Sequence, residues 1–175
     1  MPIKTIFIDR DGVINKEKNY LYKIEDFEFI NGVFQACLHF NKLGYKIIIV
    51  TNQSGISRGY YSIKDFERLN AWMLSKFKKN HVDILDVFYC PHIPSEKCKC
   101  RKPKPGMFIS AKQKHNINMK NSWMIGDSER DITAASLAGI TNTIIVRSGH
   151  KIDEEHSQAK FLLNSIKDIK DLINL

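Results

Sequence analysis

Short apolar runs recur along the chain and are separated by longer segments with helical periodicity. β-Branched residues are frequent in the runs, and apolar side chains follow one another without regular alternation. This pattern is typical of strands in a parallel sheet that is buried on both faces. The predicted strands span Thr5–Ile8, Lys46–Thr51, Ile84–Tyr89, Trp123–Ile125 and Thr143–Val146, and Phe161–Leu163 is predicted to be a strand at the edge of the sheet.

The segments between these strands have apolar residues at helical spacing, together with residue types that begin or end helices. Ser62 and Asp65 predict a capping box at the start of one helix. Pro105 fits the first turn of another, and Gly139 ends a third. The predicted helices run over Val33–Leu43, from Ser62 toward Lys79, from Pro105 through Gln113, over Glu129–Ala138 and over Ile166–Ile173. Alternating strands and helices predict a single α/β domain over residues 1–175 with a doubly wound, mostly parallel sheet.

The composition of the chain indicates where the protein is located and what it binds. The chain is 43% hydrophobic, which suffices for a core, yet no apolar run approaches the roughly 18 residues of a membrane-spanning helix. The N-terminal segment lacks the apolar stretch of a secretory signal, so we expect a cytoplasmic protein.

The net charge of +8 fits binding to nucleic acid, to an anionic membrane or to phosphorylated small molecules. The lysines are scattered, which favours a solvated surface over binding to nucleic acid or membrane. We expect a monomer, because no long amphipathic stretch remains beyond the core helices.

Polar residues stand where the predicted strands end. Asp9 follows the first strand, Thr51 ends the second, Cys90 follows the third and Asp127 follows the fourth. Ligands of such sheets bind outside the carboxyl ends of the strands. Four polar segments are therefore predicted to converge on one rim.

The first of these segments is Asp9-Arg10-Asp11-Gly12-Val13. Two carboxylates two residues apart repel each other and raise one pKa, and a cation relieves this cost. The pattern fits a nucleophile at Asp9 and a proton-transfer group at Asp11, although a polar turn after a strand also explains it when it is taken alone.

The second segment, Thr51-Asn52-Gln53-Ser54-Gly55, follows the most apolar strand. Its hydroxyl, amide and backbone N–H groups are suited to binding a phosphoryl group. A polar loop with a glycine would explain the segment if it stood alone.

A third segment, Arg101-Lys102-Pro103-Lys104-Pro105-Gly106, places a lysine between a cysteine-rich loop and a proline. Fixed in this way, Lys102 can act as a point charge on phosphate oxygens. Most Lys/Pro clusters are ordinary loops, so this motif also needs the others.

The fourth segment runs from Gly126 to Asp131. Asp127 ends a strand and suits Mg²⁺, which binds one or two carboxylates together with waters and phosphate oxygens. Asp131 lies four residues later and is predicted to orient the site without binding the metal itself. Glu129 is explained by the preference of helix N-termini for acidic residues.

Three of the four cysteines form a cluster with a histidine. Cys90, His92, Cys98 and Cys100 offer three sulfurs and one imidazole, which suit a closed, structural zinc site. In a cytoplasmic protein this spacing favours a metal over disulfides. Cys37 lies apart in an apolar helical pattern and is predicted to be a buried thiol.

Together, the order and the strand-end placement of the four segments resemble the haloacid dehalogenase superfamily of phosphatases over nearly the whole chain. The resemblance implies a Rossmann-like fold, Asp9 as nucleophile and Asp11 as acid and base. Thr51 and Lys102 correspond to the family's phosphate-binding residues. It also implies catalytic Mg²⁺ held by Asp9, Asp127 and the backbone carbonyl of Asp11. No segment between the motifs is long enough for a sizeable cap domain, so we expect an open site.

The resemblance narrows at Asp9–Asn15, at Thr51–Gly59 and at Cys100–Met107, which are similar to the heptose 1,7-bisphosphate 7-phosphatases. This implies a phosphorylated sugar as substrate and removal of its C7 phosphate during bacterial heptose synthesis. The implied substrate contacts are Asp9, Arg10, Asp11, Glu17, Lys18, Asn19, Tyr20, Thr51, Asn52, Gln53, Ser54, Arg101, Lys102 and Ser128. Two positions depart from the pattern: Val13 replaces the commoner Thr, and Ser128 stands where some members carry Lys.

Three other functions compete with this one. A histidinol-phosphate phosphatase resembles the first motif and the cysteine loop, but typically differs after Thr51-Asn-Gln and after Arg101-Lys-Pro. A polynucleotide 3′-phosphatase fits the basic charge, but not the zinc loop or the lack of interleaved aromatic residues. A catalytically inactive binding scaffold predicts loss of the reactive groups, and these are all present.

Overall fold

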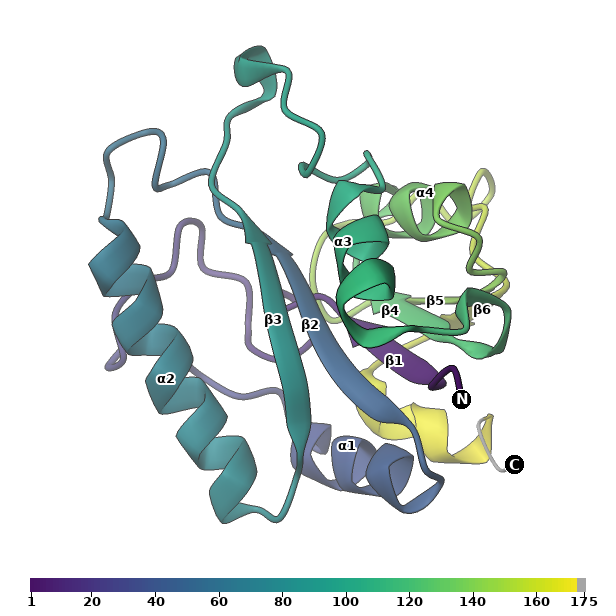
Figure 1. Cartoon of the computed structure of the whole chain (residues 1–175). Coiled ribbons are helices and arrows are strands. Elements are labelled where there is room, and N and C mark those ends of the chain that lie inside the picture. Colours follow the sequence, from purple (N-terminus) through teal and green to yellow (C-terminus); the bar gives the residue numbers. More distant parts are fainter. Residues whose placement is uncertain (173–175) are drawn as a thin grey trace.

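A six-stranded, entirely parallel sheet forms the centre of the molecule (Figure 1). The computed structural model describes residues 1–172. The strands lie in the order β3-β2-β1-β4-β5-β6. Their bounds are Thr5–Ile8 for β1, Lys46–Asn52 for β2, Ile84–Cys90 for β3, Trp123–Gly126 for β4, Asn142–Val146 for β5 and Phe161–Leu163 for β6. The predicted fold class is confirmed, including the place of β6 at an edge.

The register of the central strands brings the predicted site together. Ile8 of β1 pairs with Ile49 of β2 on one side and with Ile125 of β4 on the other. The strands then end within a few residues of these pairs, so Asp9, Thr51 and Asp127 reach the same rim. β1 lies between β2 and β4, which places Asp9 at the middle of that rim.

Helices cover both faces of the sheet, as the doubly wound pattern predicts (Figure 1). The α-helices are α1 (Val33–Lys42), α2 (Ile63–Lys79), α3 (Gly106–His115) and α4 (Glu129–Leu137), and short 3₁₀ turns lie at Pro94–Glu96, Met119–Asn121 and Ile166–Asp171. Ile47 and Ile49 pack in one core cluster with α1, α2 and the last 3₁₀ turn, whereas Ile48 and Val50 pack in a second with α3 and α4. Successive side chains of β2 therefore serve opposite layers.

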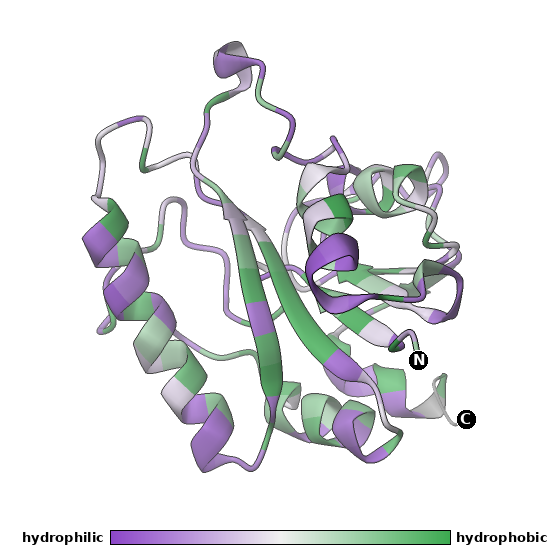
Figure 2. Ribbon diagram, in the orientation of Figure 1, coloured by the Kyte–Doolittle hydropathy of each residue, from purple (hydrophilic) through white to green (hydrophobic). Residues whose placement is uncertain are grey.

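The capping box predicted at the start of α2 is present. The Ser62 hydroxyl accepts a hydrogen bond from the Asp65 N–H at 3.1 Å, and the Asp65 carboxylate accepts one from the Ser62 N–H at 2.9 Å. Such a cap stabilises a helix by about 1 kcal/mol. Buried apolar residues recur every three or four positions along α2, at Phe66, Leu69, Met73 and Phe77, so they lie on one side of the helix. Hydrophobic and hydrophilic residues are accordingly interspersed along α2 in Figure 2.

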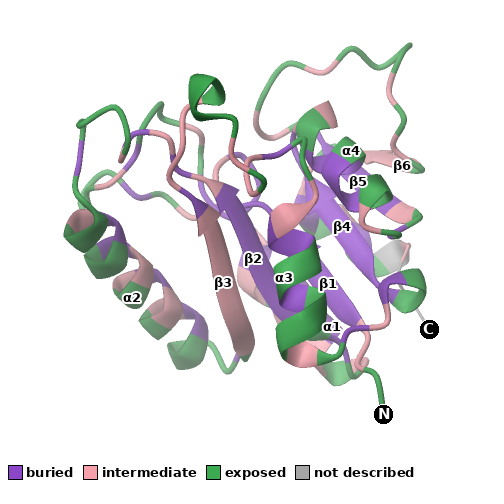
Figure 3. Ribbon diagram, turned by 45° about the horizontal axis from the view of Figure 1, so that its top comes forward, coloured by how far each residue is buried: buried purple, intermediate pink, exposed green. Residues whose placement is uncertain are grey.

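Two details of the sequence-based prediction were wrong. Ile84–Tyr89 was predicted to be buried on both faces, but these residues are half-buried because β3 lies at an edge of the sheet, in contrast to the buried β1, β2 and β4 (Figure 3). The last predicted helix is a 3₁₀ turn that spans Ile166–Asp171. Short segments commonly adopt this tighter turn. The predicted end at Ile173 lies outside the described residues.

Other expectations are confirmed within residues 1–172. Cys37 is fully buried, and burial raises the pKa of its thiol, so it stays protonated. The part of the chain that is described contains no helix long and apolar enough to cross a membrane.

Candidate active site

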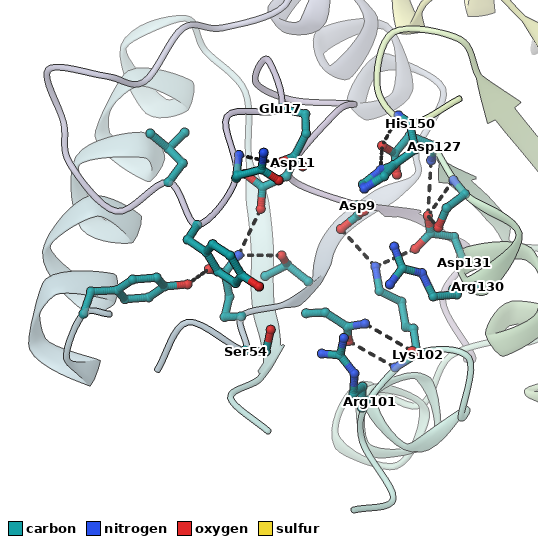
Figure 4. Close-up of a pocket in the computed structure, with 18 residues that line it drawn as sticks. Asp9, Asp11, Glu17, Ser54, Arg101, Lys102, Asp127, Arg130, Asp131 and His150 are labelled. Carbon is teal, nitrogen blue, oxygen red and sulfur yellow. Dashed lines mark hydrogen bonds and ion pairs between the residues drawn. The ribbon is translucent and has the colours of Figure 1, made fainter. Parts of the chain in front are cut away.

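A pocket of about 190 Å³ lies at the carboxyl ends of β1, β2 and β4 (Figure 4). Acidic side chains from the ends of β1 and β4 and from α4 line it, and the end of β2 contributes hydroxyl and amide groups. Lys102 and Arg101 come from the loop that precedes α3, and further lining residues come from the loops after β1 and β2. The site predicted at the rim is therefore one pocket, which is lined by both acidic and basic side chains.

Asp9 lies at the base of this pocket and is 9% exposed. Its Oδ1 accepts a hydrogen bond from the Arg10 N–H at 2.8 Å and lies 2.9 Å from Lys102 Nζ. Burial raises the pKa of Asp9 well above its usual value, and the neighbouring carboxylates of Asp131 and Asp127 raise it further against the opposing effect of Lys102. The site thus has an excess of negative charge that a divalent cation would offset.

Lys102 is the buried cation of the site, with 2% of its surface exposed. Its Nζ lies 2.5 Å from Asp131 Oδ1 and donates a hydrogen bond to the Val50 carbonyl at 2.9 Å. Burial alone would lower the pKa of Lys102, but the carboxylates of Asp131 and Asp9 outweigh it and raise the pKa. Lys102 is therefore held as a cation beside the predicted nucleophile.

The backbone of Lys102 is fixed by Asn52. The Asn52 side chain donates to the Lys102 carbonyl at 3.2 Å and accepts from the Lys102 N–H at 3.1 Å. These two bonds tie the cysteine loop to the end of β2. Asn52 thereby positions the cation rather than presenting its amide freely to a ligand.

Asp9, Asp127 and Asp131 form a buried group whose carboxylate oxygens lie within 4.8 Å of one another. The Oδ2 of Asp131 accepts from the N–H groups of Asp127 and Ser128 and from the Ser128 hydroxyl at 3.1–3.2 Å. Because Asp131 also pairs with Lys102, its oxygens are already engaged. Asp9 and Asp127 are thus the better metal ligands, and Asp131 fits the orienting role predicted for it.

His150 also contacts Asp127. Its backbone N–H donates to Asp127 Oδ2 at 2.9 Å, and its Nδ1 lies 2.6 Å from the same oxygen. Burial raises the pKa of Asp127, the Asp131 carboxylate raises it further, and His150 lowers it. His150 therefore helps to keep Asp127 ionised.

Two glycines allow the chain to approach Asp127 closely. A Cβ on Gly12 would lie 2.2 Å from Asp127 Oδ2, and one on Gly149 would lie 2.0 Å from it. Gly12 also has a φ of 85°, which side chains disfavour. Any larger residue at either position would displace the carboxylate.

Asp11 is held by hydrogen bonds on both of its oxygens. Oδ1 accepts from Arg10 Nη2 at 2.7 Å and from Asn15 Nδ2 at 3.0 Å, and Oδ2 accepts from Gln53 Nε2 at 3.1 Å. Arg10 is 2% exposed and also donates to the Leu21 carbonyl at 3.0 Å. The guanidinium thus links Asp11 to the loop after β1. That loop carries Glu17 and forms one wall of the pocket.

Gln53 connects the second motif to this network. Its Nε2 donates to Thr51 Oγ1 at 2.8 Å, and its Oε1 accepts from the Tyr61 hydroxyl at 2.6 Å. Burial raises the pKa of Tyr61 to about 12, so the phenol retains the proton that it donates. Thr51 and Gln53 are 1% and 2% exposed, so this side of the pocket is closely packed.

The predicted zinc ligands lie together beyond the end of β3. Cys90 Sγ lies 2.8 Å from Cys100 Sγ and 3.6 Å from Cys98 Sγ, and His92 Nδ1 lies 3.2 Å from Cys100 Sγ. Four zinc ligands in a tetrahedron with metal–sulfur bonds of about 2.3 Å would be roughly 3.8 Å apart. The donor set and its compactness fit zinc. Arg101, next in the chain, donates to the His92 carbonyl at 3.1 Å.

Most predicted substrate contacts line the pocket. Those that do are Asp9, Asp11, Glu17, Asn19, Tyr20, Thr51, Asn52, Gln53, Ser54, Arg101, Lys102 and Ser128. Arg10 and Lys18 are not among the lining residues. The Arg10 side chain donates to Asp11 and to the Leu21 carbonyl, and Lys18 pairs with Glu28 on the surface.

Four lining residues were absent from the sequence-based prediction: Leu21, Tyr61, Arg130 and His150. His150 follows the end of β5 by four residues, so the rule that places ligands at strand ends could have indicated it. Arg130 lies within the fourth motif, but nothing in the sequence shows whether it faces the pocket or the solvent.

Known proteins are similar to this chain in sequence and in fold. Residues 99–169 match the Hydrolase_like family model, described as HAD-hyrolase-like. A D-glycero-alpha-D-manno-heptose-1,7-bisphosphate 7-phosphatase of Photorhabdus laumondii is 47% identical over 98% of this chain and 97% of its own length. The chain belongs to the HAD-like phosphatases.

A second relative and a solved structure are also similar to this HAD-like phosphatase. A D-glycero-beta-D-manno-heptose-1,7-bisphosphate 7-phosphatase of Vibrio cholerae is 45% identical over 94% of the chain and 92% of its own length. The crystal structure of a D,D-heptose 1,7-bisphosphate phosphatase from B. bronchiseptica, complexed with magnesium and phosphate, matches with a TM-score of 0.87, 25% identity and 97% coverage of each chain. The predicted family and the predicted class, a phosphoric monoester hydrolase, are both confirmed.

Proposed function

We propose that this phosphatase removes the C7 phosphate of D-glycero-D-manno-heptose 1,7-bisphosphate through an aspartyl-phosphate on Asp9. The reaction would serve bacterial heptose synthesis for lipopolysaccharide or a related glycan. The observation that carries the proposal is the contact of Asp9 with Lys102 in a pocket whose rim holds further cations. The names of the relatives point to the same substrate.

In the first step, Asp9 attacks the C7 phosphorus and the bond from phosphorus to the C7 oxygen breaks. Asp11 gives a proton to the leaving oxygen, so the sugar departs as an alcohol. In the second step, Asp11 takes a proton from water, and the water oxygen attacks the phosphorus. Asp9 leaves as a carboxylate and inorganic phosphate is released. Lys102 neutralises charge on the phosphoryl oxygens in both steps.

We propose that Asp9, Asp127 and the Asp11 carbonyl hold Mg²⁺. When bound, the ion supplies positive charge to the phosphoryl oxygens and relieves the repulsion between the buried carboxylates. We further propose that Cys90, His92, Cys98 and Cys100 hold a structural zinc. That zinc would fix the loop which carries Arg101 and Lys102, because ligand binding supplies folding free energy to a segment with little core.

The substrate is tested by comparing kcat/KM for heptose 1,7-bisphosphate, histidinol phosphate and a 3′-phosphorylated oligonucleotide. We expect the bisphosphate to exceed the other two by at least about 100-fold, because Lys102 and the cations at the rim match two phosphates. A higher value for either competitor would contradict the proposed substrate while leaving the phosphatase class intact.

The two metal sites should differ in exchange and in effect. Brief treatment with EDTA should stop turnover, and Mg²⁺ alone should restore it, while one zinc per chain remains by elemental analysis. Cys98→Ser should lower kcat/KM by about 10-fold or more before it unfolds the domain, because it loosens the loop next to Lys102. A zinc-free Cys98→Ser protein with a native circular dichroism spectrum and full activity would contradict the positioning role.

We propose that the enzyme acts as a cytoplasmic monomer built from one domain. Asp9, Lys102 and Asp127 lie together in the pocket, so the reacting groups all come from one domain. Size-exclusion chromatography with light scattering would contradict the monomer if it gave the mass of a dimer at assay concentrations.

A further inference from the structure

Arg130 is a cation that lines the pocket and forms no ion pair with any described side chain. It lies in the first turn of α4, two residues after the N-cap Ser128, and its side chain is exposed at the rim of the pocket. In the close-up it extends from α4 toward the side of the pocket where Lys102 and Asp131 lie (Figure 4). No hydrogen bond to its guanidinium is present either among the side chains that the structure describes.

The acidic residues on either side of Arg130 are engaged elsewhere. Glu129 accepts from the Ser157 hydroxyl at 2.5 Å and from the Gln158 N–H at 3.2 Å, so its carboxylate faces the loop before β6. Asp131 pairs with Lys102 and caps the helix. Neither carboxylate compensates the charge of Arg130, although both adjoin it in sequence.

A helix N-terminus is an unfavourable place for a lone cation. The unpaired N–H groups of the first turn carry partial positive charge, so an arginine there is repelled unless an anion lies nearby. The same N–H groups and the guanidinium would both favour a phosphate group in front of the turn. A phosphate group at this end of α4 would therefore give the Arg130 guanidinium a hydrogen-bonding partner that it lacks in the free protein.

The remaining lining cations differ from Arg130 in what they contact. Lys102 is buried and lies beside Asp9, so it acts on the phosphoryl group that is transferred. Arg101 already donates to the His92 carbonyl and comes from the cysteine loop instead of from α4. Arg130 is exposed at the rim, which is suited to a phosphate that is remote from the nucleophile.

We infer that Arg130 binds the phosphate that is not transferred, and so contributes to selectivity for a bisphosphate. This inference rests on the proposed substrate. Arg130 replaces the positive charge that Ser128, its neighbour in the same motif, does not supply. Its planar group can bind two phosphate oxygens at once, which a lysine cannot do in the same way.

The test compares heptose 1,7-bisphosphate with heptose 7-phosphate as substrates of the holoenzyme. In Arg130→Gln, the ratio of the two kcat/KM values should fall about 10-fold, mainly through a higher KM for the bisphosphate. Arg130→Lys should restore part of the ratio. Arg68→Gln is the matched control, because Arg68 is an exposed arginine on another helix, paired with Asp65 and outside the pocket. It should leave the ratio unchanged.

The outcomes separate the inference from the proposed substrate. If the wild-type enzyme prefers the bisphosphate and Arg130→Gln keeps that preference, the inference is wrong and the substrate stands. An equal loss of kcat on both substrates would assign Arg130 to the transferred phosphoryl group and would also contradict the inference. A wild-type enzyme with no preference for the bisphosphate would contradict both. Thermal melting should show that Arg130→Gln is folded, because its removal relieves a charge at a helix N-terminus.

Discussion

Asp9→Asn is expected to abolish turnover, with a loss on the order of 10⁴ or more, as for other enzymes that lose a covalent nucleophile. An amide oxygen is a far weaker nucleophile than a carboxylate and cannot form the acyl phosphate. The fold should persist, because the substitution preserves shape and removes a charge that Asp127 and Asp131 oppose. Steady-state release of phosphate is the measurement.

The control for this variant is Asp26→Asn, which removes a carboxylate from an exposed position outside the pocket. Intact-mass spectrometry should confirm that the amide introduced at position 9 has not hydrolysed. Activity above about 1% of wild type in a folded, intact Asp9→Asn protein would exclude Asp9 as the nucleophile, since loss of a covalent nucleophile costs far more than this.

Lys102→Met should have the second largest effect, on both activity and stability. The loss of a fixed charge beside the transferred phosphoryl group should lower kcat by about 10²–10³. The variant also leaves Asp9 and Asp131 without their buried partner. Without Mg²⁺, the free energy of unfolding should therefore fall by roughly 3 kcal/mol. Kinetics at saturating substrate and denaturant melts with and without Mg²⁺ would measure both effects.

The matched control is Lys112→Met, which removes an exposed lysine of α3 outside the active-site pocket. Added Mg²⁺ should recover part of the stability of Lys102→Met, because the ion offsets the same carboxylates. A Lys102→Met enzyme with unchanged kcat would show that the lysine is needed only for folding. Unchanged stability would contradict the charge balance inferred from the ion pairs.

The polar residues at the strand ends could be predicted, because each of them directly follows an apolar strand in the sequence. Asp9, Thr51 and Asp127 each follow such a strand, and parallel pairing then forces them onto one rim. The direction of a side chain depends on contacts that sequence does not give. Arg10 and Lys18 lie in the right loop, yet their side chains turn to Asp11 and Glu28 instead of lining the pocket.

Other features depend on partners far away in sequence. β3 proved half-buried because strand order placed it at an edge, and its apolar run gives no sign of that position. His150 comes within 2.6 Å of Asp127 only because Gly149 and Gly12 let the loop after β5 pack against that carboxylate. The clustering of Cys90, His92, Cys98 and Cys100, by contrast, could be predicted, because these four residues of metal-binding type lie within eleven positions of the sequence.

The stereochemical course at phosphorus tests the double-displacement mechanism most directly. Each in-line displacement inverts the phosphorus centre, so attack by Asp9 followed by attack of water gives net retention. The measurement uses a substrate whose C7 phosphate is made chiral with oxygen isotopes and sulfur, and determines the configuration of the thiophosphate released. We predict retention. Inversion would show that water attacks the substrate directly and that Asp9 never carries the phosphoryl group.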